Sequence, residues 1–207
     1  MWNMLNIGLL IGSIILIIVV ALATKRHGKL QDAKNRRFLE EEQEANMARK
    51  REIDPKLFFY ADLINFPRIP ESDPHKVLRT SRRTMIRFEE PETNVELKKR
   101  YGPSQLESIA QYEENFVDFL KSLGDWAQAL YDEGSLDGAI QVLDYAVRLG
   151  SEFRATYRLA ADIYANRRDT GALGQLHHMA QQNHFKDPVI QGHVLSYIEE
   201  KMQELRI

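Results

Sequence analysis

Cysteine is absent from the 207 residues of this chain. Disulfide bridges, thiolate metal ligands and cysteine nucleophiles are therefore excluded. Also absent are a glycine-rich phosphate-binding loop, a nucleophile elbow and two carboxylates spaced for acid–base catalysis. The adjacent pairs Glu113-Glu114 and Glu199-Glu200 diverge around a helix, so their side chains cannot act together as acid and base. The sequence predicts that the chain is not an enzyme and binds no cofactor.

Metal-binding patterns are also scarce. Four of the six histidines lie close together in the sequence: His177, His178, His184 and His193. No Asp or Glu stands at the spacing of a zinc-binding HExxH helix. Asn183 is expected to end a helix, so His177 and His184 would not share a helical face. We therefore expect these histidines on a helix surface and in a loop, without a metal.

Charged side chains are missing from residues 1–24, and a basic cluster follows at once: Lys25, Arg26, His27 and Lys29. The 20 residues 5–24 match the ~20 that cross a hydrocarbon core of ~30 Å. Only a helix satisfies its own backbone hydrogen bonds there, so residues 1–24 are predicted to form a transmembrane helix. Basic residues beside a span stay in the cytoplasm, which predicts an outside N-terminus and a cytoplasmic C-terminal domain. The expected location is a bacterial plasma membrane.

Two further interpretations concern this N-terminal segment. Ala21-Leu22-Ala23 fits the cleavage site of a secretory signal, although no positive charge precedes the apolar run and the run is long for a signal core. Gly8 and Gly12 form the small-xxx-small pattern through which two membrane helices can pack closely. A homodimer through the transmembrane helix is therefore an alternative to a monomeric anchor.

The two halves of the chain carry opposite charge. Residues 1–100 hold 19 Lys and Arg against 14 Asp and Glu, whereas residues 101–207 hold 9 against 16. Basic residues beside a membrane are attracted to anionic lipid headgroups, so the stretch Lys25–Arg37 is expected to contact them. The acidic distal half argues against nucleic acid as a partner, because its sign is wrong for a phosphate backbone.

Two segments of different character lead up to residue 104. Residues 25–52 are rich in charge and sparse in apolar side chains, which predicts a helical juxtamembrane spacer. Residues 53–103 form a proline-rich segment, and five of the chain's seven prolines lie between residues 53 and 100. Long helices and central strands are therefore excluded there. Aromatic residues in Leu57-Phe58-Phe59-Tyr60 are untypical of a disordered linker. We expect an extended segment that lies against the C-terminal domain, the membrane or a partner, with a short helix at residues 94–100.

A basic run without any acid occupies residues 75–88 within this segment. It has three open interpretations, namely contact with lipid phosphates, contact with the acidic distal half, or exposure to solvent.

Helical periodicity dominates residues 104–207. Apolar residues recur at 3.6-residue spacing, and no proline occurs between Pro103 and Pro188. Gly134-Ser135, Gly150-Ser151 and Thr170-Gly171 separate one helix from the next. The fold class is therefore predicted to be all-α, with antiparallel helical hairpins. Five apolar faces define the helices: Phe116 to Leu130, Leu136 to Val147, Tyr157 to Tyr164, Leu173 to Ala180, and Val194 to Leu205.

The hairpins recur after 34 residues. Leu123-x-x-Trp126-Ala127-x-x-Leu130, followed by Gly134 to Ile140, resembles the tetratricopeptide motif, whose helix–turn–helix period is 34 residues. The resemblance covers residues 120–187; the second unit departs from the pattern at Leu173 and His177. Five positions of the first unit, Ala127, Leu130, Ala139, Leu143 and Ala146, correspond to Ala161, Tyr164, Leu173, His177 and Ala180.

Neither unit ends in the usual proline, because Ser151 and Phe185 stand there. Stacks of this kind need about three repeats to bury a core, so the helix at residues 105–118 and the terminal helix at residues 188–205 are expected to act as caps. A helical hairpin of another family is the alternative.

The resemblance implies a concave groove that binds a peptide or a partner helix. We accordingly expect a membrane-anchored, cytoplasm-facing adaptor that binds other proteins. The alternative function is a structural accessory subunit of a membrane complex, packed through Gly8 and Gly12. Mitochondrial import receptors have a similar layout, so a eukaryotic origin stays open. The residues expected to bind the partner are Gln128, Tyr131, Asp132, Arg154, Arg158 and Asp162.

Overall fold

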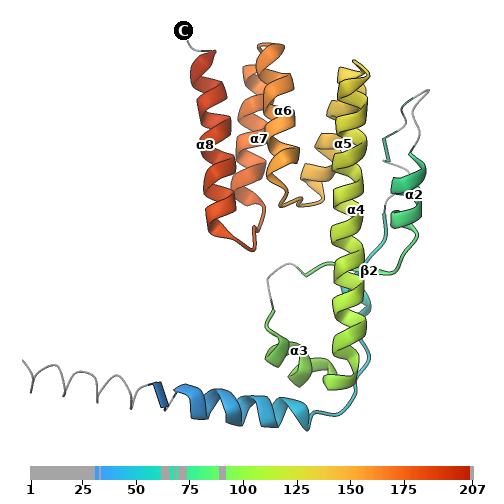
Figure 1. The fold of residues 1–207 in the computed structure, drawn as a ribbon, viewed down its shortest axis with the longest axis vertical. Coiled ribbons are helices and arrows are strands. Elements are labelled where there is room, and N and C mark those ends of the chain that lie inside the picture. The colour runs from blue at the N-terminus through green and yellow to red at the C-terminus, as the bar shows by residue number, and fades with distance from the viewer. Residues whose placement is uncertain are drawn as a thin grey trace, which may run out of the picture. The chain divides into compact units, whose positions relative to one another are not determined.

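The computed structural model describes residues 31–32, 34–61, 66–67, 69, 74–88 and 92–205. The predicted transmembrane helix at residues 1–24, with Gly8 and Gly12, lies outside these residues. Among the described residues, no helix is both long and apolar enough to cross a membrane. The described part is mostly helical and has two short strands, which confirms the predicted all-α class (Figure 1). It divides into two compact units.

The first unit combines the residues up to Arg51 with Asn94–Ser104. Residues 34–46 are helical, and α3 (Asn94–Tyr101) packs against this helix. Lys98 of α3 forms an ion pair with Glu42, and Ala45 is fully buried. After α3, Gly102 has a φ of +85°, and a Cβ there would lie 2.9 Å from the Arg49 carbonyl oxygen. The turn therefore needs glycine both for its conformation and for its close approach to residues 49–50.

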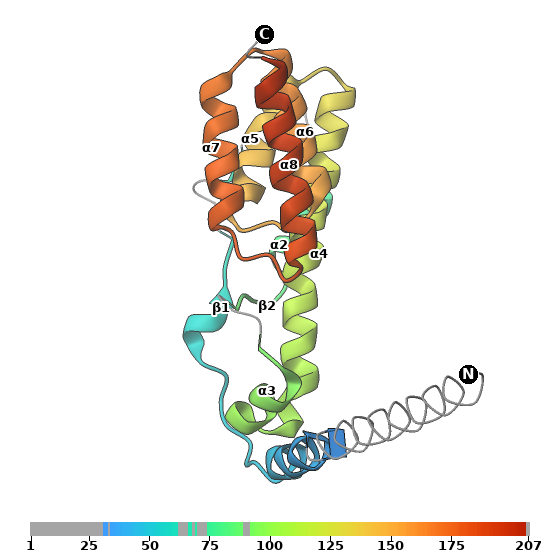
Figure 2. The ribbon, with the colours of Figure 1, turned by 90° about the vertical axis from the view of Figure 1, so that its left-hand side faces the viewer.

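The second unit is built on five successive helices that pack as neighbours (Figures 1 and 2). Each helix packs on the next, and α6 also contacts α8. The apolar faces predicted from the sequence are buried: Phe119, Leu123, Ala127, Leu143, Tyr157, Ala161, Leu173 and Ile198 are among the core residues. The helices are α4 (Leu106–Asp132), α5 (Leu136–Arg148), α6 (Arg154–Asn166), α7 (Thr170–Gln182) and α8 (Pro188–Glu204).

Three of these helices end in the same way. The amides of Ser135, Ser151 and Asp169 each donate to a carbonyl five residues earlier, at distances of 2.8 to 3.0 Å. The residue before each amide has positive φ, namely Gly134, Gly150 and Arg168. This is the Schellman arrangement, in which a left-handed residue satisfies the last helical carbonyls. Glycine adopts positive φ readily because it has no Cβ, which suits the first two positions. Arg168 adopts a φ of +55° although it has a Cβ.

One expected boundary is absent from the structure. The sequence predicted a capping helix at residues 105–118 that precedes the first repeat helix. The structure instead has the single 27-residue helix α4 across both. Its first half needs an apolar covering, which the proline-rich segment supplies.

That covering is a strap, defined as the described residues between Leu57 and Phe88. Its aromatic residues follow α4 toward the C-terminus. The Phe59 ring lies 5.0 Å from that of Phe116, and the Phe66 ring stacks on Trp126 at 5.8 Å. The strands β1 (Phe58–Phe59) and β2 (Met85–Ile86) pair antiparallel, with Phe59 opposite Met85. The proline-rich segment therefore lies on the helical domain, one of the three surfaces that its sequence left open.

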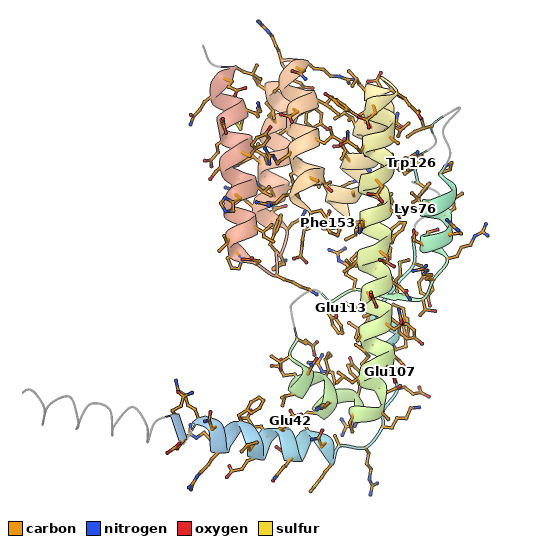
Figure 3. All side chains as sticks on the ribbon, in the orientation of Figure 1. Glu42, Lys76, Glu107, Glu113, Trp126 and Phe153 are labelled. Atoms are coloured by element: carbon orange, nitrogen blue, oxygen red, sulfur yellow. The ribbon has the colours of Figure 1, made fainter. Side chains whose placement is uncertain are left out.

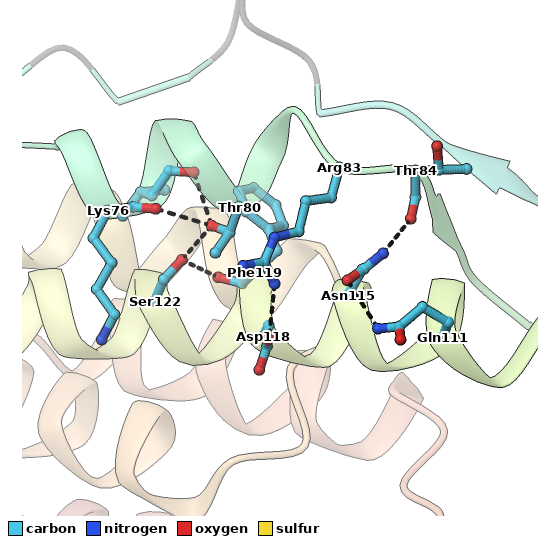
Figure 4. A network of polar contacts seen from close by, with 10 residues as sticks. Lys76, Thr80, Arg83, Thr84, Gln111, Asn115, Asp118, Phe119 and Ser122 are labelled. Carbon is cyan, nitrogen blue, oxygen red and sulfur yellow. Dashed lines mark hydrogen bonds and ion pairs between the residues drawn. The ribbon is translucent and has the colours of Figure 1, made fainter. Parts of the chain in front are cut away.

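The basic run returns along α4 in the opposite direction, as α2 (His75–Ser81) and the residues after it (Figure 4). Lys76 pairs with Asp125, and Arg83 Nη1 lies 2.9 Å from Asp118 Oδ2. Between these pairs, the Thr80 and Ser122 hydroxyls lie 2.9 Å apart in a buried hydrogen bond. Two of the basic side chains thus meet acids of the distal half, which was one of the interpretations of this run.

Candidate functional site

The second unit contains an open groove of about 530 Å³. One wall is the middle of α4, and another is the strap where it leaves β2. The remaining sides are the loop between α5 and α6, the loop between α7 and α8, and the first turn of α8. Glu113 on α4 and Phe153 at the start of α6 mark two of these sides (Figure 3). The lining is Ile86, Arg87, Phe88, Glu113, Phe116, Val117, Leu120, Gly150, Glu152, Phe153, Gln182, Asn183, His184, Lys186 and Ile190.

The groove is mainly apolar, and one of its apolar side chains, Val117, is exposed to solvent. Val117 is 41% exposed, although its neighbour Phe116 is buried in the core. A volume of several hundred Å³ with apolar walls and a few polar groups is typical of ligand sites in proteins. The groove therefore offers apolar surface that no described part of the chain covers.

A buried polar network fixes the two loops that border the groove. The Tyr157 hydroxyl donates to the Ser151 carbonyl at 2.7 Å and accepts from Asn183 Nδ2 at 2.8 Å. Asn183 Nδ2 also donates to the Val147 carbonyl, at 2.9 Å. Gln191 Nε2 of α8 donates to the Asn183 carbonyl oxygen at 3.2 Å. The loop before α6 and the end of α7 are thus held to each other through one phenol.

The environment of this phenol changes its acidity. Burial raises the pKa of Tyr157 to about 12, with a further increase from the charge of Glu152 and an opposing effect of the Asn183 hydrogen bond. Tyr157 therefore stays protonated over the physiological range, as a donor to Ser151 must.

Charged groups of the groove are partly paired with each other. Lys186 Nζ forms an ion pair with Glu113 of α4, and its backbone amide donates to Glu152 Oε2 at 2.7 Å. Both groove carboxylates are thus engaged by one residue. The Arg87 guanidinium has no ion-pair partner among the described residues, and it lies against Gly150, where a Cβ would be 3.1 Å from Nη2. Arg87 is consequently the cation of the groove that is available to a ligand.

The six residues predicted to bind a partner are not among those that line this groove. Arg158 and Asp162 of α6 contact α8 instead. The Arg158 guanidinium lies 4.6 Å above the Tyr197 ring, and the Tyr197 hydroxyl donates to Asp162 Oδ1 at 2.6 Å. Burial and the hydrogen bond to Asp162 raise the pKa of Tyr197. The structure therefore gives this pair a role in docking the last helix.

The other four predicted residues are dispersed. Gln128 Nε2 donates to Asp132 Oδ1 at 2.9 Å, so these two exposed residues of α4 contact each other. Tyr131 packs against the core, and Arg154 is the exposed first residue of α6. The expectation that the six bind a partner stays a prediction, and it now concerns a surface other than the groove.

The histidines do not gather around a common point. His177 Nε2 lies 3.0 Å from Glu199 Oε1 of α8, whereas His184 lines the groove. Within the described residues, no group of three or more His, Asp or Glu side chains is arranged to hold a metal ion. The helix containing His177 ends at Gln182, with Asn183 as its C-cap, as predicted.

Sequence reasoning missed the groove because its walls come from five places in the chain. One local signal was present: Val117 is apolar but lies beside the buried stripe of α4 rather than in it. In comparisons with protein-family models, with curated proteins and with solved structures, nothing matches this chain.

Proposed function

We propose that this chain is a membrane-anchored adaptor whose helical domain binds a segment of a partner protein in the groove. The observation that carries the proposal is the open apolar groove of the second unit, with Val117 exposed at its surface. When a ligand covers apolar surface of this kind, the free energy of the system falls by about 25 cal/mol per Å² removed from water. The groove has no cluster of reactive groups, so binding is the activity that it supports best.

The groove also indicates the chemistry of the segment. Phe116, Val117 and Leu120 of α4 favour apolar side chains in the ligand. Arg87 is the groove's unpaired cation among the described residues, since Glu113 and Glu152 are already engaged by Lys186. A guanidinium binds a carboxylate with two parallel hydrogen bonds. The proposed ligand is therefore a segment with apolar side chains next to an Asp or Glu.

The helical domain is proposed to be a short tetratricopeptide-like stack. Its antiparallel pairs are α4 with α5 and α6 with α7, and α8 follows as the terminal helix. Support comes from the positions related by 34 residues. Ala127 and Ala161 are both fully buried in the first helices of the two pairs, and Ala146 and Ala180 are fully buried in the second helices.

The membrane placement is proposed from the sequence. Residues 1–24 would be the anchor, and the basic residues after Thr24 would keep the helical domain in the cytoplasm. A protease added from the non-cytoplasmic side should then leave the C-terminal domain intact. Digestion from that side would contradict the proposed orientation.

A site-specific crosslink tests the groove. The photoreactive residue p-benzoylphenylalanine is placed at Val117 in the full chain, and native membranes are irradiated. Gln203 of α8 is the control, because it is exposed on a helix of the same unit and lies near the other end of α8 from the groove. We expect a specific crosslinked protein from position 117 and none from position 203. The same product from both positions would contradict binding in the groove.

Arginine variants test the chemistry of the ligand. Arg87→Glu should reduce the position 117 crosslink by about tenfold or more, since a charged hydrogen bond contributes about 1.5–3 kcal/mol. Arg79→Glu is the control, because Arg79 is an exposed arginine of α2 outside the groove. Mass spectrometry should then place the crosslink in a segment that contains an Asp or Glu. A crosslink that survives Arg87→Glu, or a segment without an acid, would overturn the assignment.

A further inference from the structure

The first helix of the first unit exposes two adjacent large apolar side chains. Phe38 is 58% exposed and Leu39 is 57% exposed, although both lie inside the helical stretch 34–46. Apolar residues on a helix normally face a packed surface. In this helix the packed part is the C-terminal half, around Ala45, where α3 contributes Leu97 and Tyr101 to the buried residues.

The helical spacing separates these apolar residues from most of the acids. At 3.6 residues per turn, about 100° per residue, Phe38 and Leu39 border a face whose edges are Lys34 and Arg36. Glu40 and Glu44 project from the opposite side of the helix. Lys and Arg at the edges of an apolar face are typical of helices that lie in a membrane surface, because their long stems carry the charge to the headgroups.

Two acids share the apolar face. By helical spacing the exposed Asp32 falls beside Leu39, so the basic side chains at the edges of the face have to outweigh its charge. Glu42 lies one turn after Phe38, and a free carboxylate there would be repelled by anionic lipid. The structure pairs it with Lys98 of α3, and both side chains are largely covered (Figure 3 labels Glu42). Lys99 of α3 similarly lies 3.3 Å from Glu44 Oε2. With Glu42 paired to α3, the exposed first turns of the helix carry three cations, Lys34, Arg36 and Arg37, against the one acid Asp32.

The position of this helix in the chain limits its distance from the proposed anchor. Nine residues lie between Thr24 and Lys34, so the two are ten steps of the chain apart and at most about 33–36 Å even when the chain is fully extended. Lys25, Arg26 and Lys29 lie within that interval. We propose that Phe38 and Leu39 insert into the surface of an anionic bilayer, with Lys34 and Arg36 binding its headgroups. This inference rests on the membrane anchor of the proposed function and adds a second membrane contact.

The absence of cysteine allows a direct test on the full chain. Asn35→Cys places a single thiol on the apolar face between Phe38 and Leu39, and Glu40→Cys places one on the opposite side of the same helix. Each thiol is labelled with the fluorophore NBD, and the chain is reconstituted into nanodiscs of phosphatidylcholine with and without phosphatidylglycerol. Quenching by doxyl-labelled lipid then reports contact with the acyl chains.

We expect the label at position 35 to be quenched severalfold more than the label at position 40 when phosphatidylglycerol is present. The double variant Phe38→Ser with Leu39→Ser should lower quenching at position 35 to the level of position 40. The double variant Lys34→Glu with Arg36→Glu should lower it in anionic discs. Phe38 and Leu39 are exposed, so these changes should leave the packing around Ala45 intact.

Three results would overturn the inference. Equal quenching at positions 35 and 40 would show that the helix does not lie on the bilayer, and equal quenching in both lipids would exclude anionic recognition. A label at position 35 that is shielded from water but not quenched by lipid would identify a protein, such as a second copy, as the occupant. A third label at Thr24→Cys separates failure of the anchor from failure of this inference, because it should be quenched whenever the anchor is inserted.

Discussion

At the scale of single residues, Tyr157 has the most consequential position near the groove. Its ring is fully buried and lies 5.5 Å from that of Phe185 in the loop before α8. Its hydroxyl donates to the Ser151 carbonyl and accepts from the Asn183 side chain. Ser151 lies before α6 and Asn183 lies after α7, so the hydroxyl connects the two ends of the α6–α7 hairpin. The shape of the groove near Gly150 and Asn183 therefore depends on one hydroxyl group and its proton.

The stability of the second unit should depend on that proton. Burial raises the pKa of Tyr157 to about 12 in the folded state, whereas an unfolded tyrosine titrates near pH 10. Between these values the folded state binds more protons than the unfolded state, so stability falls as the pH rises through this window. By pH 11 the loss should reach about 1.4 kcal/mol, which corresponds to one pKa unit.

The variant Tyr157→Phe isolates this effect. At neutral pH it should lower the free energy of unfolding by about 1–3 kcal/mol, because Asn183 and the Ser151 carbonyl lose a buried partner. The difference between wild type and variant should then shrink by about 1.4 kcal/mol at pH 11, where only the wild type loses stability through this phenol. Urea unfolding at the two pH values measures both quantities. If the difference between wild type and variant stays constant, burial does not raise the pKa of Tyr157.

At the scale of elements, the strap depends on its aromatic side chains. Phe66 is buried between Trp126 and Tyr145, with ring centroids at 5.8 and 5.7 Å. Phe66→Ala should lower the free energy of unfolding by about 3 kcal/mol, within the usual range for a buried Phe. Tyr60→Ala is the control from the same strap, because Tyr60 is 79% exposed and its loss should change stability by less than about 0.5 kcal/mol. Equal effects of the two variants would contradict the observed packing.

The charged contacts of α2 should contribute much less. The Lys76–Asp125 and Arg83–Asp118 pairs are each about half exposed. Exposed ion pairs typically contribute about 0–1 kcal/mol, and salt screens them. The double variant Lys76→Gln with Arg83→Gln should therefore cost under about 2 kcal/mol, and high salt should remove most of the difference from wild type. A larger cost in urea unfolding that high salt does not reduce would show that these two side chains hold α2 through contacts other than exposed ion pairs.

Local sequence patterns were sufficient to predict where the helices lie, but not which helices and segments pack against each other. The apolar period of residues such as Phe119, Leu123 and Ala127 is a property of one helix, and the structure buries these residues as expected. The continuity of α4 was missed because the covering of its first half comes from Phe58 and Phe59, about 50 residues earlier in the sequence. The docking of Tyr197 on Arg158 and Asp162 was missed for the same reason, since periodicity does not specify which helices meet.

At the scale of the whole molecule, the two units have separate proposed tasks. The first unit contains the proposed anchor in its sequence and the exposed Phe38 and Leu39 that are proposed to meet lipid. The second unit contains the groove that is proposed to bind a partner. The chain enters the second unit at Glu52, leaves it after Thr93 and returns to it at Gln105, so it crosses between the units three times before α4. Because each unit is compact by itself, variants of one unit should be testable without altering the other.

An exchange of the anchor separates the adaptor from the accessory-subunit alternative. Residues 1–24 are replaced by an unrelated single span of equal length, and the crosslink from position 117 is measured in native membranes. An adaptor needs the anchor only for placement, so the yield should stay within about twofold of the wild type, a change of under ~0.5 kcal/mol. A subunit packed through Gly8 and Gly12 would lose its neighbours with the exchange, because those glycines allow close helix packing.

The double variant Gly8→Leu with Gly12→Leu is the matched control within the chain's own anchor. It keeps the apolar length of the segment and removes the small-residue pattern. Retention of the crosslink in both the exchange and the double variant would place recognition in the groove. Loss in both would place it in the membrane, and the groove would then have no part in choosing the partner. Loss in the exchange alone would indicate that other residues of the anchor make the contact, which contradicts the adaptor proposal as well.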